Sequence, residues 1–463
     1  MSEKKINYKK ASTYYLIGNI FNKGMSFLTV PIFTRLLSTY DYGIVTTYNS
    51  WISILSMVMG FAIYMGIRAS FVDYSDDTDT ILSTATTFTL ICGTTMSGII
   101  FLGLFFIRIN VSMLLIVLCL LQGMSSALIQ NYSMFLMMKY RYKFRTAIMI
   151  LPNLISAILS IVAIMFVVRT NMYMGRIVPT ALVTFCFGLL TVVLVYKGSK
   201  VFRLDYLKYM LSISAPLVIH GIALQILSQS DRTMITCLAD ASQTGIYSLI
   251  YNFSMISVVI TTALDGVWVP WFTARLKNYE YQKINQKCHM YIWLMTLPII
   301  GVIILGPEVV KILASERYWD GILIIPPVVF SNYIIFAYTL YVNIEHFHKK
   351  TIYITVNTLV AASVNIILNY ILIPHYGYVA AAYTTLVSYI IALIFHAIYA
   401  KKLEPSLYPL SFFLLPILAI VLAIVLFYVL IDMWIVRWGI MMALLLFVSI
   451  RERKNIVSII KCK

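Results

Sequence analysis

A charged residue, Lys23, stands in the middle of the first long apolar run of this chain. Three polar residues share its helix face at helical spacing: Asn19, Asn22 and Ser26. An ionisable side chain inside a membrane is costly unless it faces a partner or a water-filled cavity. The stripe therefore predicts a binding site within the membrane.

A second polar stripe lies about 202 residues further along the chain, around Arg232. Four polar residues share the face of Arg232: Gln225, Ser228, Gln229 and Thr236. At the offset of about 202 residues, Lys23 matches Gln225 and Ser26 matches Ser228, so both stripes are predicted to line one central cavity. The alternative is that these groups only form hydrogen bonds between helices, and two cations near one cavity argue against it.

Carboxylates and further cations accompany the two stripes. Asp231 precedes Arg232 but points about 100° away from it on a helix. Asp265 is either a carboxylate that couples transport to a proton or cation, or an ion-pair partner of a cavity cation; both interpretations stay open. Arg35 and Arg68 lie at the ends of apolar runs, where long basic side chains reach lipid headgroups, and are further candidates for substrate contact.

The composition indicates which kind of structural element must position these residues. Of 463 residues, 61% are hydrophobic and 11% charged, and the mean hydropathy is +0.88, whereas a soluble domain keeps roughly 25% charged residues. The apolar runs are near the roughly 20 residues that cross a bilayer as a helix, and they lack the alternation of a β-barrel. The sequence predicts an all-α membrane protein of about fourteen transmembrane helices. The predicted spans are 13–36, 43–67, 82–107, 112–137, 147–168, 174–196, 210–237, 244–271, 290–313, 321–344, 352–373, 377–399, 411–431 and 433–450.

Basic residues gather on alternate loops between these spans. Of the 35 Lys and Arg in the chain, 26 lie on one side and 7 on the other. The remaining two, Lys23 and Arg232, lie inside predicted helices. This bias predicts that both termini lie in the cytoplasm, and it explains the net charge of +17 by anionic membrane lipids instead of nucleic acid. The six scattered cysteines contain no CxxC pair, so no disulfide framework and no metal site are predicted.

The chain also resembles itself at the offset of about 202 residues. Residues 37–44 match 239–246, and Gly175 matches Gly377. The repeat predicts two pseudo-symmetric six-helix lobes around a central cavity, in residues 1–200 and 201–402. Two extra helices and a basic cytoplasmic tail are predicted in residues 403–463.

Two stretches of the sequence resemble a known family. Residues 21–43 and the segments 230–235 and 244–248 are similar to bacterial polysaccharide repeat-unit flippases. These are the Wzx-type O-antigen and capsule exporters of the multidrug/oligosaccharidyl-lipid/polysaccharide superfamily. The resemblance implies a transporter of the bacterial inner membrane, not an enzyme, without a cofactor. It implies lobes that open alternately to either face and carry an undecaprenyl-pyrophosphate-linked oligosaccharide to the outer leaflet.

The implied substrate suits the buried cations. A pyrophosphate that crosses hydrocarbon needs fixed positive charge, which Lys23 and Arg232 would supply, Arg by bidentate contact. The product is a surface polysaccharide: O-antigen of lipopolysaccharide, capsule or another exopolysaccharide. Besides membrane lipids, a polysaccharide polymerase or chain-length regulator is a candidate partner.

Other functions stay open at this stage. A drug or organic-cation antiporter of the same superfamily would line its cavity with carboxylates, whereas the stripes here carry cations. A lipid II flippase shares the same pyrophosphate chemistry. An integral-membrane glycosyltransferase would need a catalytic acidic motif and a channel would need a filter loop, and the sequence shows neither.

Overall fold

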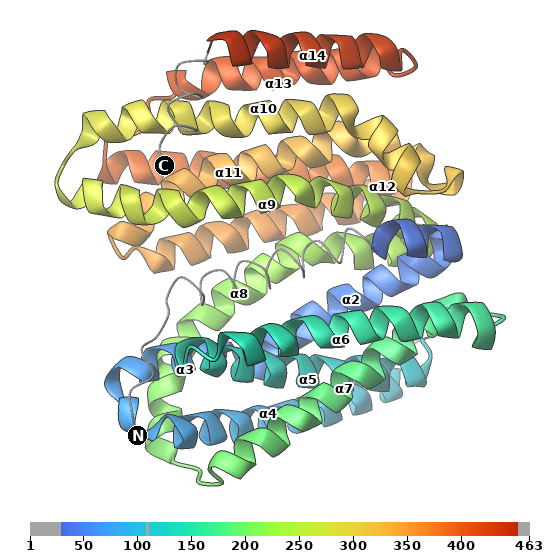
Figure 1. The fold of residues 1–463 in the computed structure, drawn as a ribbon, viewed down its shortest axis with the longest axis vertical. Coiled ribbons are helices and arrows are strands. Elements are labelled where there is room, and N and C mark those ends of the chain that lie inside the picture. Colours follow the sequence, from blue (N-terminus) through green and yellow to red (C-terminus); the bar gives the residue numbers. More distant parts are fainter. Residues whose placement is uncertain (1–28, 108–110, 452–463) are drawn as a thin grey trace. The chain divides into compact units, whose positions relative to one another are not determined.

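The computed structural model describes residues 29–107 and 111–451, and these are helical with no β-strand among them (Figure 1). Ten helices in this part of the chain are long and apolar enough to cross a membrane, or eleven if the bent pair α2 and α3 is one span. The predicted all-α membrane fold is confirmed. The first predicted span lies mostly outside the described residues, the last is a shorter apolar helix, and two predicted spans lie in the single helix α12.

The chain forms two compact units. Unit 1 takes the described residues up to Gly245 together with Thr358–Tyr378. Its helices are α2 (Thr39–Gly60), α3 (Ile63–Asp73), α4 (Thr78–Ile107), α5 (Met113–Met138), α6 (Tyr142–Val162), α7 (Met172–Gly198) and α8 (Leu204–Leu238), with a 3-10 turn at Ser75–Asp77 and a π-helical turn at Ala163–Val167. Residues 29–36 are also helical.

Unit 2 takes Ile246–Asn357 and the described residues from Val379 onward. Its helices are α10 (Tyr281–Leu313), α11 (Ile325–Phe347), α13 (Ser411–Val429) and α14 (Trp434–Arg451), with a 3-10 segment at Glu316–Ile324. Two helices run through both units: α9 (Ala241–Lys277) and α12 (Thr351–Leu403). The lobe boundaries at residues 200 and 402 stay predictions.

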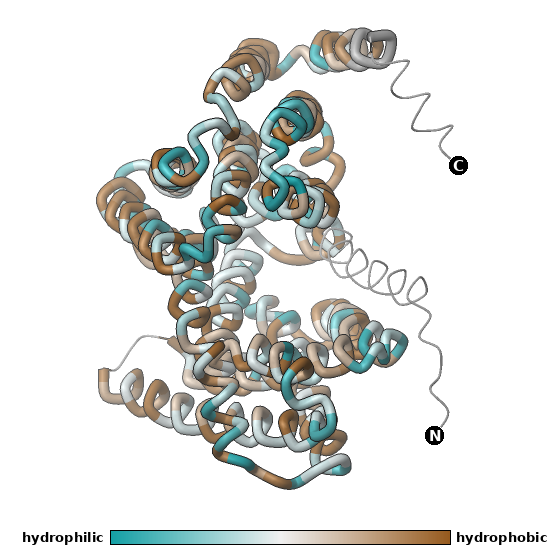
Figure 2. Tube along the Cα trace, turned by 90° about the vertical axis from the view of Figure 1, so that its left-hand side faces the viewer, coloured by the Kyte–Doolittle hydropathy of each residue, from teal (hydrophilic) through white to brown (hydrophobic). Residues whose placement is uncertain are grey.

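Hydrophobic residues occur along the helices, and hydrophilic residues gather at several of the turns between them (Figure 2). Within unit 1, buried residues of α3, α4, α5, α6, α7 and α8 form one hydrophobic cluster, which includes Ile63, Phe135 and Met210. Burial of such side chains stabilises the packing of each helix within its unit.

Two helices break where the backbone leaves helical geometry. The predicted span 43–67 is in fact α2 and α3, bent by 43° at Phe61 and Ala62, which both have positive φ. In α12 the break falls at Gly377, with φ +58°, between the two spans predicted there. A Cβ at Gly377 would lie 2.0 Å from Oε1 of Gln243, and this oxygen accepts a hydrogen bond from Tyr378 N at 3.0 Å. Only glycine fits this position without strain.

The segments that match in the internal repeat pack against each other within unit 1. A Cβ at Gly43 would lie 1.7 Å from the Ala241 carbonyl oxygen, and a Cβ at Gly245 would lie 2.0 Å from the Thr39 carbonyl oxygen. The two contacts are equivalent, because Thr39 matches Ala241 and Gly43 matches Gly245 at the same offset. The repeat therefore brings the first turns of α2 and α9 together about an approximate twofold axis, and both glycines are required by this close approach.

Candidate functional site

Helix α8 carries Arg232 of the second predicted stripe and its neighbour Asp231, and the structure buries both. Arg232 is 5% exposed and Asp231 is 0% exposed. Because neighbouring residues on a helix point about 100° apart, the two side chains face different surroundings. The hydrogen bonds described below join each of them to different neighbours within unit 1.

The guanidinium of Arg232 turns back along its own helix. Its Nη1 donates to the Ser228 carbonyl oxygen at 2.9 Å and to Oε1 of Gln229 at 3.1 Å. The same Gln229 oxygen accepts from Ser50 Oγ of α2 at 3.1 Å. These acceptors are uncharged, and they place the cation of α8 next to polar groups of α2.

Three threonines connect the same region of α8 to its neighbours. The hydroxyls of Thr47 in α2 and Thr236 in α8 lie 2.7 Å apart, and those of Thr236 and Thr244 in α9 also lie 2.7 Å apart. Thr47 and Thr244 both donate to the carbonyl oxygen of Arg232, at 3.5 and 3.3 Å. The backbone of Arg232 is thus fixed by α2 and by the start of α9, which limits the positions that its side chain can take.

Asp231 lies in an amide network with the first part of α12. Its Oδ1 accepts from Asn369 Nδ2 at 2.7 Å, and the same nitrogen lies 3.1 Å from Oδ1 of Asn365. Ser230 Oγ donates to Asn365 Oδ1 at 3.4 Å. Both asparagines are 0% exposed. A carboxylate and two amides offer oxygen ligands of the kind that bind hard cations.

The sequence had not singled out Asn365 and Asn369. Their signal was present, because two asparagines four residues apart in an apolar run lie on one helix face. What the sequence could not provide was their partner on α8, 138 residues away from Asn369. The separation of Asp231 from Arg232 on their helix was predicted, whereas the neighbours of each had to be observed.

Asp265 lies in unit 2, on α9, where it is half-buried. One of its carboxylate oxygens accepts a hydrogen bond from Tyr291 Oη of α10 at 3.0 Å. The ring of Tyr291 stacks on that of Trp268, with ring centroids 4.6 Å apart. The tyrosine and the tryptophan therefore hold this carboxylate at a defined place between α9 and α10.

The remaining predicted site residues are dispersed. Gln225 is half-buried on α8, one turn from Ser228. Arg35 and Arg68 are both exposed, Arg35 at the end of the helical segment 29–36 and Arg68 on α3. Three of the predicted residues lie outside the described part of the chain: Asn19, Lys23 and Ser26.

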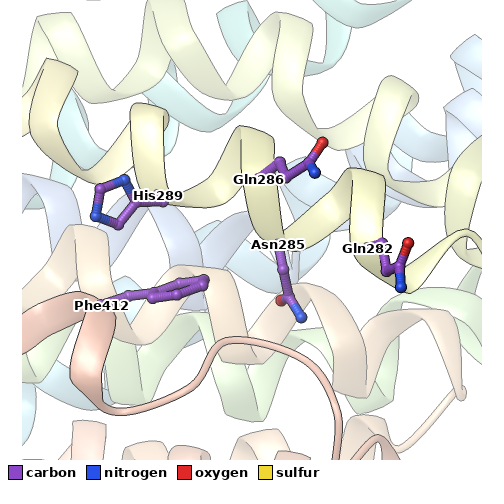
Figure 3. Close-up of a pocket in the computed structure, with 5 residues that line it drawn as sticks. All are labelled: Gln282, Asn285, Gln286, His289 and Phe412. Atoms are coloured by element: carbon purple, nitrogen blue, oxygen red, sulfur yellow. The ribbon is translucent and has the colours of Figure 1, made fainter.

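A groove in unit 2 contains none of the predicted residues. Four side chains of α10 line it together with one from the start of α13 (Figure 3): Gln282, Asn285, Gln286, His289 and Phe412. The amide of Asn285 donates to the Ser406 carbonyl oxygen at 2.8 Å and accepts from Tyr408 N at 2.9 Å. This amide holds the segment before α13 in place, so its role in the groove is structural.

Solved structures with the same fold are membrane transporters. The lipid II flippase MurJ, in an inward closed conformation, superposes with a TM-score of 0.66 at 16% identity, covering 96% of this chain and 99% of that chain. An inward-facing multidrug resistance MATE transporter of the MOP superfamily gives a TM-score of 0.59 at 12% identity, covering 85% and 99%. A MOP superfamily transporter from Pyrococcus furiosus gives 0.57 at 13% identity, covering 87% and 99%. A comparison with curated protein sequences gave no match.

The described part of the chain is that of a multi-pass membrane protein, and its fold is that of the MOP superfamily transporters. Its family follows from the sequence: the profile described as "Polysaccharide biosynthesis protein" matches residues 8–275, more than half of the chain. The chain belongs to that polysaccharide biosynthesis family of transporters and flippases.

Proposed function

We propose that this protein flips an undecaprenyl-pyrophosphate-linked oligosaccharide from the cytoplasmic to the outer leaflet by alternating access. The product would be a repeat unit for surface polysaccharide, either O-antigen, capsule or another exopolysaccharide. Membership of the polysaccharide biosynthesis family supports the glycan pathway. The shared fold with a protein that flips lipid II supports a lipid-linked substrate.

The observation that carries the proposal is the buried guanidinium of Arg232. Nη1 donates to a carbonyl and to an amide oxygen, which are neutral acceptors. A pyrophosphate oxygen is charged and forms a stronger, shorter hydrogen bond with arginine, in bidentate geometry. The headgroup can therefore replace Gln229 as the acceptor when the lobes open, while the backbone of Arg232 stays fixed by the threonines.

The internal repeat suggests roles for the other predicted substrate contacts. Lys23 would supply the second cation, and Asn19, Ser26 and Gln225 would bind sugar or phosphate oxygens from the matching helix faces. Arg35 and Arg68 are exposed in the structure, which suits contact with headgroups during entry or exit.

Asp231 is the proposed site for a coupling cation. It is buried and joined to Asn369 by a hydrogen bond of 2.7 Å, and Asn365 adds a second amide oxygen next to it. Asp265 is the alternative coupling carboxylate, in unit 2, where Tyr291 donates to it.

The basic loops orient the proposed transporter in the inner membrane of a bacterium with both termini in the cytoplasm. The oligosaccharide would be assembled on that side and polymerised on the other. A polysaccharide polymerase or chain-length regulator is therefore the proposed protein partner.

A deletion in the native host tests this function. Loss of the protein should abolish the surface polysaccharide and cause an undecaprenyl-pyrophosphate-linked oligosaccharide to accumulate in the inner leaflet, as identified by mass spectrometry of extracted lipids. Complementation with Arg232→Ala should fail at normal protein levels. Normal surface glycan with Arg232→Ala would refute the role of this cation.

Arg317→Ala is the matched control, because it removes an exposed arginine from the 3-10 segment Glu316–Ile324. It should complement as well as the unmodified protein.

Two alternative functions would give different results in the same strains. Accumulation of lipid II would indicate a peptidoglycan precursor flippase, and unchanged glycan with raised drug sensitivity would indicate a drug antiporter.

A further inference from the structure

Two histidine–glutamate pairs join α11 to the second part of α12 within unit 2. In the inner pair, His396 Nδ1 lies 2.9 and 3.0 Å from the two carboxylate oxygens of Glu345. His396 is 1% exposed and Glu345 is 0% exposed. In the outer pair, His348 Nε2 lies 2.8 Å from Glu404 Oε1, and the His348 side chain is 31% exposed.

The two pairs follow each other along the helices, with the outer pair nearer the surface and the inner pair in the interior. Glu345 lies in the last turn of α11, and His348 follows directly after that helix. His396 lies about two turns before the end of α12, and Glu404 follows directly after that helix. The outer pair lies at the helix ends that carry four lysines: Lys349, Lys350, Lys401 and Lys402. The charge bias predicts that this end, called the basic end below, faces the cytoplasm.

The surroundings of the inner pair are aromatic and polar but hold few charges. The ring of Tyr338 stacks on that of His396 with centroids 5.6 Å apart and an interplanar angle of 18°. The amide nitrogen of Asn357 lies 3.4 Å from His396 Nδ1. His346 interacts electrostatically with both Glu345 and His396. His346 is therefore a titratable neighbour whose charge acts on both members of the inner pair.

The outer pair has titratable neighbours of its own. Tyr281, at the start of α10, interacts electrostatically with Glu404. On α12, Lys401 Nζ donates to the carbonyl oxygens of Pro405 and Leu407 at 3.2 and 2.6 Å. These groups make the surroundings of the outer pair polar, and the His348 side chain, 31% exposed, can exchange a proton with water at this end.

The charge of the inner pair depends on one proton. A neutral imidazole beside an ionised carboxylate has a net charge of minus one, which is costly to bury within a membrane protein. One added proton gives either imidazolium with carboxylate or imidazole with carboxylic acid, and both have no net charge. Histidine is the side chain that changes protonation between about pH 5 and 8. Burial of this pair therefore favours the form with one added proton.

We propose that Glu345 and His396 form a proton-binding site whose occupancy is linked to the transport cycle. In this proposal the pair holds one added proton while it is buried. When water reaches it from the basic end, the proton leaves through His348 and Glu404 to that water, and the pair is left with a net charge of minus one. Opening of this end thus releases one proton, and closing takes one up. The link to transport rests on the proposed function, whereas the proton site itself does not.

The protonation state can be measured directly on the full chain in lipid nanodiscs. Nitrogen NMR of labelled histidine reads the ring of His396, with His396→Gln for assignment, and difference infrared spectroscopy against Glu345→Gln reads the carboxyl group. At neutral pH we expect either an imidazolium or a protonated carboxyl. A neutral ring together with an ionised carboxylate would overturn the proposal.

The link to transport can be measured as flipping of fluorescent undecaprenyl pyrophosphate in proteoliposomes at matched inner and outer pH. Release of one proton on opening predicts that acidification slows flipping by up to about tenfold per pH unit. Glu345→Gln and His396→Gln should remove this pH dependence. The swapped double variant E345H/H396E should restore it, because it rebuilds a pair with one exchangeable proton. A wild-type pH profile in both single variants would overturn the link.

Two further variants separate the failure of this inference from the failure of the proposed function. Arg232→Ala should abolish flipping at every pH and leave the NMR and infrared spectra of the pair unchanged. Glu308→Gln, which alters the carboxylate of unit 2 that pairs with Arg437, should keep the pH profile of the wild type. If wild-type protein does not flip the probe, the proposed function fails, and the spectra alone decide whether the pair binds the proton.

Discussion

Unit 2 contains two carboxylates that each pair with a buried basic side chain, and the two basic side chains differ in chemistry. Glu308 of α10 pairs with Arg437 of α14, which is 1% exposed and also donates to the Ile304 carbonyl oxygen at 2.9 Å. Glu345 pairs with His396. Arginine keeps its proton at every physiological pH, so the first pair is a permanent link between two helices. Histidine can lose its proton, so the second pair can change its charge.

The comparison shows that burial alone does not define a functional site. Both pairs are inside the membrane unit, and removal of either partner leaves a charge in a poorly solvated place. What distinguishes them is whether the charge of the pair can change between pH 5 and 8, as only the histidine pair can. The two pairs should therefore respond differently to mutation and to pH.

The largest loss of stability is expected for Arg437→Leu. This change leaves the Glu308 carboxylate without its cation and should lower the free energy of unfolding by about 3–5 kcal/mol. The loss should be the same at pH 5.5 and 8, since arginine does not titrate there. Chemical unfolding in detergent micelles measures it, with Arg437→Lys as the matched variant. A loss under about 1 kcal/mol would show that the pair is not a structural link.

A smaller, pH-dependent loss is expected for Glu345→Gln. The amide still accepts a hydrogen bond from His396, so the cost should be about 1–3 kcal/mol near neutral pH. The wild type should lose stability as the pH rises, because the buried pair gives up its added proton, whereas the variant should not. If the free energy of unfolding varies with pH in parallel for the two proteins between pH 5 and 8, this pair does not change its charge in that range, as with Glu308 and Arg437.

The outer pair, in which the His348 side chain is 31% exposed, should contribute less to stability than the inner pair. His348→Gln removes an interaction that water partly screens, and the expected loss is about 0.5–1 kcal/mol. The same variant should slow the exchange of protons with the inner pair without changing its occupancy at equilibrium. Stability and the infrared spectrum of Glu345 can be followed on one sample. A changed occupancy would mean that His348 is part of the binding site.

The smallest effect is expected at the exposed cluster between α9 and α10. Hydrogen bonds from Lys283 and Arg275 hold the pKa of Glu280 below its usual value. A lowered pKa stabilises the folded state above the pKa of the unfolded chain, and this stabilisation is lost as the pH falls through the folded value. The melting temperatures of wild type and Glu280→Gln should therefore converge in acid. A difference that persists at low pH would point to packing.

The sequence predicted the fold well because its signals are periodic or local. Long apolar runs indicated the helices, and Gly377 marked the break in α12. The match between Gly43 and Gly245 indicated a repeat, and in the structure these two glycines pack against each other. The break at Phe61 and Ala62 was missed, because neither residue is a proline or glycine that would indicate it.

The partners of the buried charges could not be predicted, because they depend on contacts between distant helices. Glu345 fell one residue beyond a predicted span and read as the start of a loop, 51 residues from His396. Arg437 lies near the start of the predicted span 433–450 with no partner indicated by the sequence, and the structure buries it against Glu308. The different directions of Asp231 and Arg232 were predictable, since helix geometry alone sets the angle of about 100° between them.

Binding of the headgroup to Arg232 is the central claim, and one measurement tests it most directly. Undecaprenyl pyrophosphate is titrated onto the full chain in nanodiscs by native mass spectrometry, with Arg232→Ala and Arg317→Ala beside the wild type. Loss of a bidentate, charge-assisted contact predicts at least about tenfold weaker binding for Arg232→Ala, and unchanged binding for Arg317→Ala. Equal affinities of all three proteins would contradict the claim.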